Sequence, residues 1–251
     1  MLLKDFIPKI NKKYKKISFS GISFDSSKVK RNDIFFAFKG KRSDGHDFID
    51  SAIKKGAKII ISEKEILLKR KHISYLKFAN ARKLLAQIAF KISGKKPEKL
   101  VAVTGTNGKS SVSNFYYQIL KNNSKKVASI GTIGISFKEK KKLLINTTLD
   151  PISLGKILDN LKKEKIEYVI MEASSHGLHQ NRLDGLLFDI GIFTNLSHDH
   201  LDYHKTTKNY LNSKLYLFNE LIKKKGSIIS DFKIPQIKEI KKISYRKKIN
   251  L

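Results

Sequence analysis

Hydrophobic and polar positions divide the chain into two parts with different patterns. In the first part, four short runs of β-prone residues predict strands, and two stretches with a helical spacing of apolar residues predict helices. The strands are expected at 22–24, 34–38, 57–62 and 73–78, and the helices at 48–55 and 80–92. This pattern predicts a small α/β domain over residues 1–93.

The second part begins after a linker and alternates strands with helices. Residues 93–97 read Ser-Gly-Lys-Lys-Pro, and glycine and proline among polar residues are typical of a linker. Strands are expected at 100–103, 126–130, 168–171, 188–193 and 227–230, and helices at 108–120, 152–163 and 207–221. Strands separated by helices favour a doubly wound, mostly parallel α/β sheet over residues 94–251.

Three polar clusters follow strands of this predicted sheet, at 104–111, 172–176 and 194–200. In open parallel sheets, ligands bind beyond the carboxyl ends of the strands. The functional site is therefore expected where these clusters meet.

Composition excludes several kinds of protein. The 251 residues contain no cysteine, which excludes a disulfide framework, a zinc–thiolate site, an iron–sulfur cluster and a cysteine nucleophile. Hydrophobic residues make up 40% of the chain and aromatic residues 10%, too many for a disordered chain. No apolar run approaches the ~18 residues of a membrane span, and the N-terminus lacks the features of a secretory signal. We therefore expect a soluble, cytoplasmic protein with no membrane partner.

The formal net charge of +30 comes almost entirely from lysine, because only six of the 52 basic residues are arginines. Arginine is the residue whose planar fork grips phosphate and guanine. The lysines are scattered from end to end. This favours solvated lysine faces with a general affinity for anions, and no specific nucleic-acid partner is expected.

The segment 101–110, Val-Ala-Val-Thr-Gly-Thr-Asn-Gly-Lys-Ser, is typical of a phosphate-binding loop. A hydrophobic strand enters a glycine-rich turn, and Lys109 and Ser110 open a helix. Backbone N–H groups of such a turn bind phosphate oxygens together with the helix N-terminus. Lys109 is expected to reach the terminal phosphates and the Ser110 hydroxyl to ligate magnesium. Val103 stands where the general motif has its first glycine.

Acidic residues and histidines gather after two other strands. Glu172 follows the strand at 168–171, where a carboxylate commonly completes a Mg²⁺ site. The run 195–204, Asn-Leu-Ser-His-Asp-His-Leu-Asp-Tyr-His, follows the strand at 188–193. Together with His176, it holds histidine and aspartate at their highest density in the chain. These groups suit zinc, Mg²⁺ or Mn²⁺, and the residues alone leave that choice open.

Four stretches together resemble the Mur ligases, the ATP-dependent amide-bond ligases of peptidoglycan precursor synthesis. The loop at 105–110 resembles this family's variant of the Walker loop, which accounts for the absent first glycine. The motifs at 146–151, 171–178 and 193–204 resemble the member that adds the third amino acid of the peptide. In the N-terminal part, 25–26 and 40–45 resemble its UDP-binding region. The resemblance extends over essentially the whole chain.

The resemblance implies ATP and Mg²⁺ as cofactors, and a UDP-N-acetylmuramoyl-dipeptide and an amino acid, diaminopimelate or lysine, as partners. In the implied reaction the substrate carboxylate attacks the γ-phosphate of ATP to give an acyl phosphate, and the amine then displaces phosphate.

The implied catalytic residues are Lys109, His200 and Lys214. The implied ATP-binding residues are Gly105, Thr106, Asn107, Gly108, Lys109, Ser110 and Ser111. The implied metal ligands are Ser110, Glu172, His200 and Lys214. The implied substrate-binding residues are Ser26, Lys41, Arg42, Ser43, Asn146, Thr147, Thr148, Ser174, Gln180 and Arg182.

Lys214 depends on the resemblance for its role. By itself the sequence predicts a solvated lysine on the helix at 207–221. It matches the lysine that is carbamylated in the family. Addition of CO₂ to a neutral amine makes a carboxylate that can help to bind a second Mg²⁺.

The chain also departs from the family. Ser110 stands where threonine is usual, and His198 stands where arginine is common. The family has a third, C-terminal domain that binds the incoming amino acid, and nothing after Ser230 resembles it. We therefore expect a truncated sheet and an incomplete form that is inactive in ligation.

Two alternatives remain open. A folylpolyglutamate synthase would share the phosphate loop and the ligase chemistry, although the motifs at 171–176 and 199–204 argue against it. A non-catalytic nucleotide- or nucleic-acid-binding module would account for the phosphate loop and the basic composition.

Overall fold

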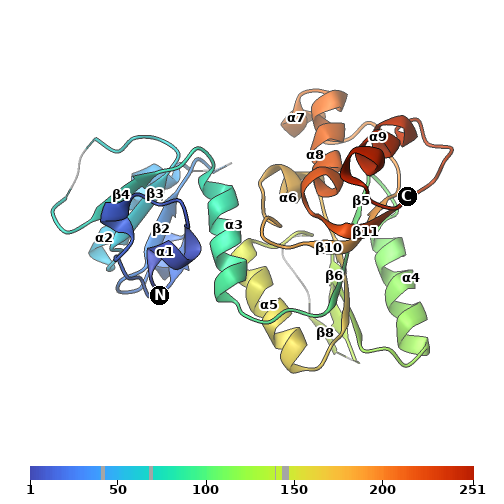
Figure 1. Ribbon diagram of the computed structural model, residues 1–251, viewed down its shortest axis with the longest axis horizontal. Coiled ribbons are helices and arrows are strands. Elements are labelled where there is room, and N and C mark those ends of the chain that lie inside the picture. Colours follow the sequence, from blue (N-terminus) through green and yellow to red (C-terminus); the bar gives the residue numbers. More distant parts are fainter. Residues whose placement is uncertain (41–42, 68–69, 139, 143–146) are drawn as a thin grey trace. The chain divides into compact units, whose positions relative to one another are not determined.

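The computed structural model describes residues 1–40, 43–67, 70–138, 140–142 and 147–251. Three of the predicted substrate-binding residues, Lys41, Arg42 and Asn146, lie outside the described residues. The chain divides into two compact units, Met1–Lys91 and Ile92–Leu251, and each has a sheet of its own (Figure 1).

The first unit is built on a parallel sheet of four strands in the order β1-β2-β3-β4. The strands are β1 (Ile22–Ser23), β2 (Ile34–Ala37), β3 (Ile59–Ser62) and β4 (Ser74–Lys77). The helices are α1 (Leu3–Phe6), α2 (Ile49–Lys54) and α3 (Ala81–Ile92), with the 3₁₀ turns η1 (Lys12–Tyr14), η2 (Ser26–Lys28) and η3 (Gly45–Phe48). The four strands and two helices predicted for this part are all present.

Burial explains why the strands and helices of this unit could be predicted from the sequence. Strands β2 and β3 are buried along their whole length, so they appear as continuous hydrophobic runs. Phe35 of β2 and Ile60 of β3 pack in one cluster with Ala52 of α2. In α3 the apolar face predicted from the spacing, including Leu84 and Ile88, is buried.

The second unit contains a sheet of seven strands in the order β11-β10-β5-β9-β6-β7-β8. They are β5 (Lys99–Thr104), β6 (Val127–Gly131), β7 (Gly134–Phe137), β8 (Lys140–Lys142), β9 (Tyr168–Glu172), β10 (Phe188–Phe193) and β11 (Ile222–Ser230). The five strands from β11 to β6 are parallel, which confirms the predicted sheet. β7 and β8 extend it with antiparallel pairing that the sequence did not predict, since β8 is a run of lysines without a hydrophobic pattern.

Six helices accompany this sheet among the described residues. They are α4 (Lys109–Asn122), α5 (Pro151–Lys163), α6 (Ser175–His179), α7 (Leu201–His204), α8 (Thr207–Glu220) and α9 (Ile237–Lys247). Helices α4 and α5 flank the sheet on opposite sides (Figure 1). The short helices α6 and α7 were not predicted, because one turn is too short to show a hydrophobic period. Helix α9 was also missed.

The strand order determines where the polar clusters lie. β10, β5 and β9 are adjacent and parallel, with Thr104 opposite Phe193 and Val103 opposite Glu172. The segments that follow these three strands therefore leave the same edge of the sheet, as predicted.

In the part of the chain that the structure describes, no helix combines the length and the apolar character that a membrane crossing requires.

Candidate active site

A cavity of about 290 Å³ lies in the second unit, at the carboxyl edge of its sheet. It brings together residues from the loop after β5, the ends of β6 and β9, and helices α6 and α8. The predicted site residues that line it are Thr106, Asn107, Gly108, Lys109, Ser110, Ser111, Thr147, Glu172, Ser174, His200 and Lys214. Lys109, Glu172 and His200 thus share one cavity although they are up to 91 positions apart in sequence.

The loop after β5 has a shape that glycine makes possible. Gly105 has a φ of +146°, and a Cβ there would lie 1.8 Å from the Thr194 hydroxyl oxygen. Gly108, at φ +83°, precedes α4, and no side chain of the described residues caps that helix. The first N–H groups of α4 are therefore available to an anion at the end where the helix dipole is positive.

The segment after β10 holds this loop in place. The Thr106 amide donates to the Asn195 carbonyl at 2.9 Å, and the Asn107 amide donates to the Asn195 side chain at 3.0 Å. The Thr194 hydroxyl donates to the Asn107 carbonyl at 2.6 Å, and the Ser197 amide donates to the Thr106 hydroxyl at 3.0 Å. The loop is thus held on its neighbour before any ligand binds.

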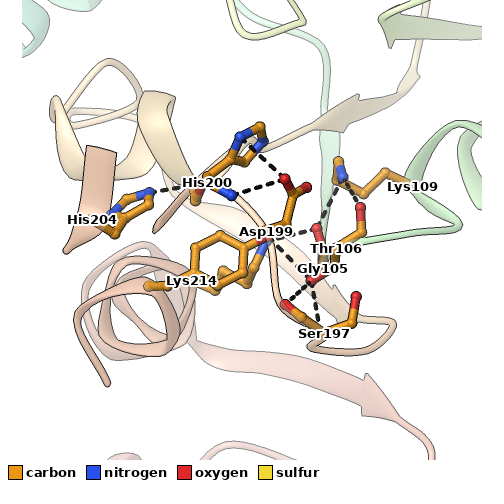
Figure 2. Close-up of polar contacts among 10 residues, drawn as sticks. Gly105, Thr106, Lys109, Ser197, Asp199, His200, His204 and Lys214 are labelled. Atoms are coloured by element: carbon orange, nitrogen blue, oxygen red, sulfur yellow. Dashed lines mark hydrogen bonds and ion pairs between the residues drawn. The ribbon is translucent and has the colours of Figure 1, made fainter. Parts of the chain in front are cut away.

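Two lysines converge on this loop. Lys109 Nζ donates to the Gly105 and Thr106 carbonyls at 2.9 and 2.7 Å, and Lys214 Nζ donates to the same Gly105 carbonyl at 2.7 Å (Figure 2). Only 1% of Lys214 is exposed, so the prediction of a solvated lysine was wrong. The reason is that the buried face of α8, which also carries Tyr210 and Ser213, packs inward beside the loop.

Burial changes the proton affinity of both amines. Desolvation and the charge of Lys109, partly opposed by Asp199, together lower the pKa of Lys214 to about 7. Desolvation also lowers the pKa of Lys109, and the carboxylates of Glu172 and Asp199 partly oppose the shift. Lys214 can therefore carry a neutral amine near neutral pH, which an ordinary lysine does not.

Glu172 is a buried carboxylate in the wall of the cavity, with 3% of its surface exposed. Its Oε1 accepts from the Ser110 hydroxyl and from the Thr132 amide, both at 2.9 Å, and its Oε2 accepts from the Thr132 hydroxyl at 3.1 Å. Among the described residues, no lysine or arginine forms an ion pair with it. A buried carboxylate of this kind is suited to bind a metal ion that enters the cavity together with a ligand.

The donors in the cavity match magnesium better than zinc. Ser110 and Glu172 offer oxygen atoms, and Mg²⁺ commonly uses one or two carboxylates and completes its shell with phosphate oxygens and water. His200 is exposed, and its ring nitrogen Nδ1 lies 3.5 Å from the Asp199 carboxylate. Across the described ranges, no three histidine, aspartate or glutamate side chains are grouped closely enough to hold a metal ion by themselves.

Three imidazoles, those of His176, His179 and His204, lie against the Tyr203 ring, and a fourth, that of His200, lies against His176. The ring of His176 lies 4.1 Å from that of Tyr203 and 4.8 Å from that of His200, and His179 Nδ1 lies 2.9 Å from the Tyr203 hydroxyl. His204 is the buried member of this group. Desolvation, followed by the neighbouring imidazoles and Lys214, lowers its pKa to about 4.

Three further predicted substrate ligands, Thr148, Gln180 and Arg182, form one hydrogen-bonded chain with Ser174. The Ser174 amide donates to the Thr148 hydroxyl at 2.9 Å, and Arg182 donates to the Thr148 carbonyl at 2.6 Å. The same guanidinium donates to Gln180 Oε1 at 3.1 and 2.7 Å. Thr148, Ser174, Gln180 and Arg182 are thus positioned as a group.

The remaining predicted ligands lie in the first unit. Ser26 begins the turn η2 and is half-buried. Ser43 is exposed, and its carbonyl accepts from the Gly40 amide at 2.8 Å.

The structure also places in the site residues that were not among the predicted site residues. Thr132 holds Glu172 through two hydrogen bonds, Asp199 lies near both lysines, and the Tyr210 hydroxyl lies 3.1 Å from that of Thr106. Thr132 follows strand β6, so its position after a predicted strand at 126–130 was a usable signal. Tyr210, in the middle of a helix, gave no such signal.

Comparison with known proteins shows where this arrangement belongs. Residues 103–251, more than half of the chain, match the Mur ligase middle domain. The chain belongs to the Mur ligase family. Residues 18–91 match a second description of the same family, its catalytic domain.

Individual Mur ligases resemble the chain in sequence and structure. The UDP-N-acetylmuramoyl-L-alanyl-D-glutamate–2,6-diaminopimelate ligase of Clostridium tetani is 40% identical over 233 residues, which cover 91% of this chain and 48% of that protein. A solved structure of a ligase with the same name has a TM-score of 0.83 at 28% identity and covers 98% of this chain and 50% of its own. The Thermotoga maritima MurF ligase in complex with ADP has a TM-score of 0.58 at 23% identity, covering 91% of this chain and 48% of its own. The chain spans about half the length of the curated relatives it matches.

Proposed function

We propose that this chain supplies the ATP-binding and UDP-substrate-binding parts of a ligase that adds the third amino acid to UDP-N-acetylmuramoyl-L-alanyl-D-glutamate. The observation that carries the proposal is the single cavity lined by Lys109, Ser110, Glu172, His200 and Lys214. The names of the relatives favour diaminopimelate over lysine as the amino acid. We place the reaction in the cytoplasm, where ATP and UDP-linked precursors are available.

ATP is proposed to bind with its phosphates on residues 105–111. The uncapped N-terminus of α4 offers backbone N–H groups, and Lys109 offers a cation that now donates to the loop's own carbonyls. A phosphate oxygen would replace those carbonyls as the acceptor for Lys109. The Mur ligase of Thermotoga maritima, of similar fold, was solved with ADP, which is consistent with this role.

Magnesium is proposed to bind beside these phosphates, at the Ser110 hydroxyl, the Glu172 carboxylate and His200. When bound, it would neutralise phosphate charge. Lys214 is proposed to be carbamylated and so to become a further oxygen ligand. Its burial and its lowered pKa support this, because CO₂ adds to the neutral amine and not to the ammonium ion.

The UDP-linked dipeptide is proposed to bind along Thr147, Thr148, Ser174, Gln180 and Arg182. Its uridine end is proposed to bind in the first unit, at Ser26, Ser43 and the neighbouring Lys41 and Arg42, with Asn146 as a further contact. In this arrangement the substrate carboxylate lies near the γ-phosphate, so that alignment and charge neutralisation by Lys109 lower the barrier.

The chain by itself is proposed to bind these ligands without completing ligation. It spans about half the length of its relatives.

Titration of Mg·ATP into the purified chain tests the proposal directly. We expect Lys109→Ala to abolish binding and to leave the unfolding temperature nearly unchanged. Lys121→Ala, an exposed lysine on the same helix, is the matched control and should bind like the unmodified chain. Equal binding by both variants would contradict the proposed site.

A second titration separates the alternatives. We expect the UDP-muramoyl-dipeptide, and not dihydrofolate, to bind. Binding of an oligonucleotide should weaken steeply with salt and should be unaffected by Lys109→Ala, as expected for scattered lysines. Tight folate binding, or salt-resistant oligonucleotide binding, would favour the competing functions.

A further inference from the structure

His204 is a buried histidine that connects two walls of the cavity. Its Nε2 lies 3.1 Å from the Ser175 hydroxyl oxygen on α6, and its Nδ1 lies 3.2 Å from the Ser213 hydroxyl oxygen on α8. His204 is 4% exposed, Ser175 2% and Ser213 6%. Ser175 lines the cavity, and Ser213 directly precedes Lys214. The roles proposed above use neither His204 nor Ser175.

The neighbours of His204 fix which of its nitrogens carries the proton. A hydroxyl group has one proton to donate. Ser213 donates that proton to the Asn209 carbonyl at 2.8 Å, so it can only accept from His204. Nδ1 is therefore the protonated nitrogen.

The second nitrogen then has to accept. Among the described residues, His204 has no carboxylate partner, and its ring is buried between Tyr203 and Tyr210. A neutral imidazole with a proton on Nδ1 is an acceptor at Nε2, and Ser175 is the donor that this nitrogen faces.

This arrangement decides what Ser175 can offer to a ligand. Its only proton points to His204, so its oxygen presents lone pairs alone toward the cavity. A phosphate or carboxylate oxygen gains nothing from such a group, whereas an amide N–H can donate to it. The neighbouring Ser174 and Thr147 belong to the proposed path of the dipeptide, which contains amide N–H groups.

We propose that His204 is a positioning residue that orients the Ser175 hydroxyl, and that Ser175 accepts a hydrogen bond from an amide N–H of the peptide substrate. The identity of that substrate rests on the proposed function. The hydrogen bond between His204 and Ser175 does not depend on the proposed function.

Two variants of His204 separate its two contacts. In His204→Asn the side-chain amide reaches the place of Nδ1 and can still donate to Ser213, but nothing replaces Nε2. In His204→Gln the longer side chain places an amide oxygen near the position of Nε2, where it can accept from Ser175. Both variants remove the imidazole ring. The difference between their affinities for the ligand therefore reports the contact with Ser175.

The main measurement is the affinity of the whole chain for UDP-N-acetylmuramoyl-L-alanyl-D-glutamate. We expect His204→Asn to weaken it about tenfold, as loss of one oriented hydrogen bond does, and His204→Gln to recover most of that loss. Ser175→Ala should weaken binding as much as His204→Asn, and the double variant should add little more, because both changes remove one contact. Affinity for Mg·ATP should change less than twofold in each variant.

Equal losses in His204→Asn and His204→Gln, or additive losses in the double variant, would overturn the proposal. Long-range ¹H–¹⁵N correlation spectra of the unliganded chain supply a readout that needs no ligand. They should show the His204 proton on Nδ1, and a proton on Nε2 would overturn the inferred orientation of Ser175. If the unmodified chain fails to bind the dipeptide, the proposed function fails, while these spectra still decide the hydrogen bond.

Discussion

Lys214 illustrates how burial changes the chemistry of a single residue. Its side chain is withdrawn from water and donates to a backbone carbonyl, while a second lysine shares that carbonyl. In the unfolded chain this amine would have a pKa of about 10.5. Between pH about 7 and about 10.5 the unfolded state therefore binds more protons, so this group makes the folded state more stable as the pH rises.

The same shift predicts when Lys214 reacts with CO₂. The neutral amine becomes the major form as the pH rises through about 7. We expect a ¹³C-carbamate NMR signal on Lys214 that grows from pH 6 to pH 8 in the presence of labelled bicarbonate. Lys214→Arg should remove the signal, and the other lysines should contribute little at these pH values. A chain without a labelled signal at pH 8 would contradict the proposed carbamylation.

A group in the first unit shows that distances alone do not define a function. His46 Nδ1 lies 2.5 Å from the Asp44 carboxylate, and its Nε2 lies 2.7 Å from the Ser62 hydroxyl oxygen. These are the contacts of a serine–histidine–aspartate triad. Ser62 is completely buried, however, and its oxygen accepts from the Lys64 amide at 2.9 Å. No substrate can reach it, so the group fixes the turn around η3 and does not act as a nucleophile.

At the scale of elements, α5 begins where its sequence specifies. The Asp150 carboxylate accepts from the amides of Ile152 and Ser153 at 3.0 Å, and Pro151 occupies the first turn. We expect Asp150→Ala to lower the free energy of unfolding by about 1 kcal/mol, measured by urea denaturation. Asp150→Ser, which keeps a capping oxygen, should recover most of this loss. Equal stability of both variants would show that the cap contributes nothing.

Packing between β6 and β9 depends on the absence of a side chain at Gly131. A Cβ there would lie 2.1 Å from Glu172 Oε1, so Gly131→Ala must displace the carboxylate. We expect this variant to weaken Mg·ATP binding at least tenfold, which a titration would measure, because Glu172 would leave its contacts with Ser110 and Thr132. Ser129→Ala, on the same strand, is the control and should bind normally. Normal binding by Gly131→Ala would mean that Glu172 does not act in the site.

At the scale of the whole molecule, the two units divide the proposed tasks. Every residue that lines the cavity belongs to Ile92–Leu251. We expect the separately expressed residues 92–251 to bind Mg·ATP within about threefold of the full chain, because the phosphate loop and its partners are all retained. Binding of the UDP-linked dipeptide should fall much more, since the proposed uridine contacts are removed. A folded fragment that does not bind Mg·ATP would contradict this division, and circular dichroism would establish that it is folded.

The sequence by itself determined the features that neighbouring residues encode. Strands β5, β9 and β10 could be predicted from their buried hydrophobic runs. The phosphate loop could be predicted from a contiguous motif. Both predictions succeed because hydrophobic periodicity and turn chemistry involve only a few neighbouring residues. It also determined that polar clusters follow these strands. Only the tertiary structure decided which clusters meet, through the strand order β10-β5-β9-β6. Three features of the site depend on segments from different strands and helices. They are the burial of Lys214, the hydrogen bonds from Thr132 to Glu172 and the contact of His204 with Ser175. Their strength depends on exclusion of water by the assembled sheet and helices, and no local pattern carries that information.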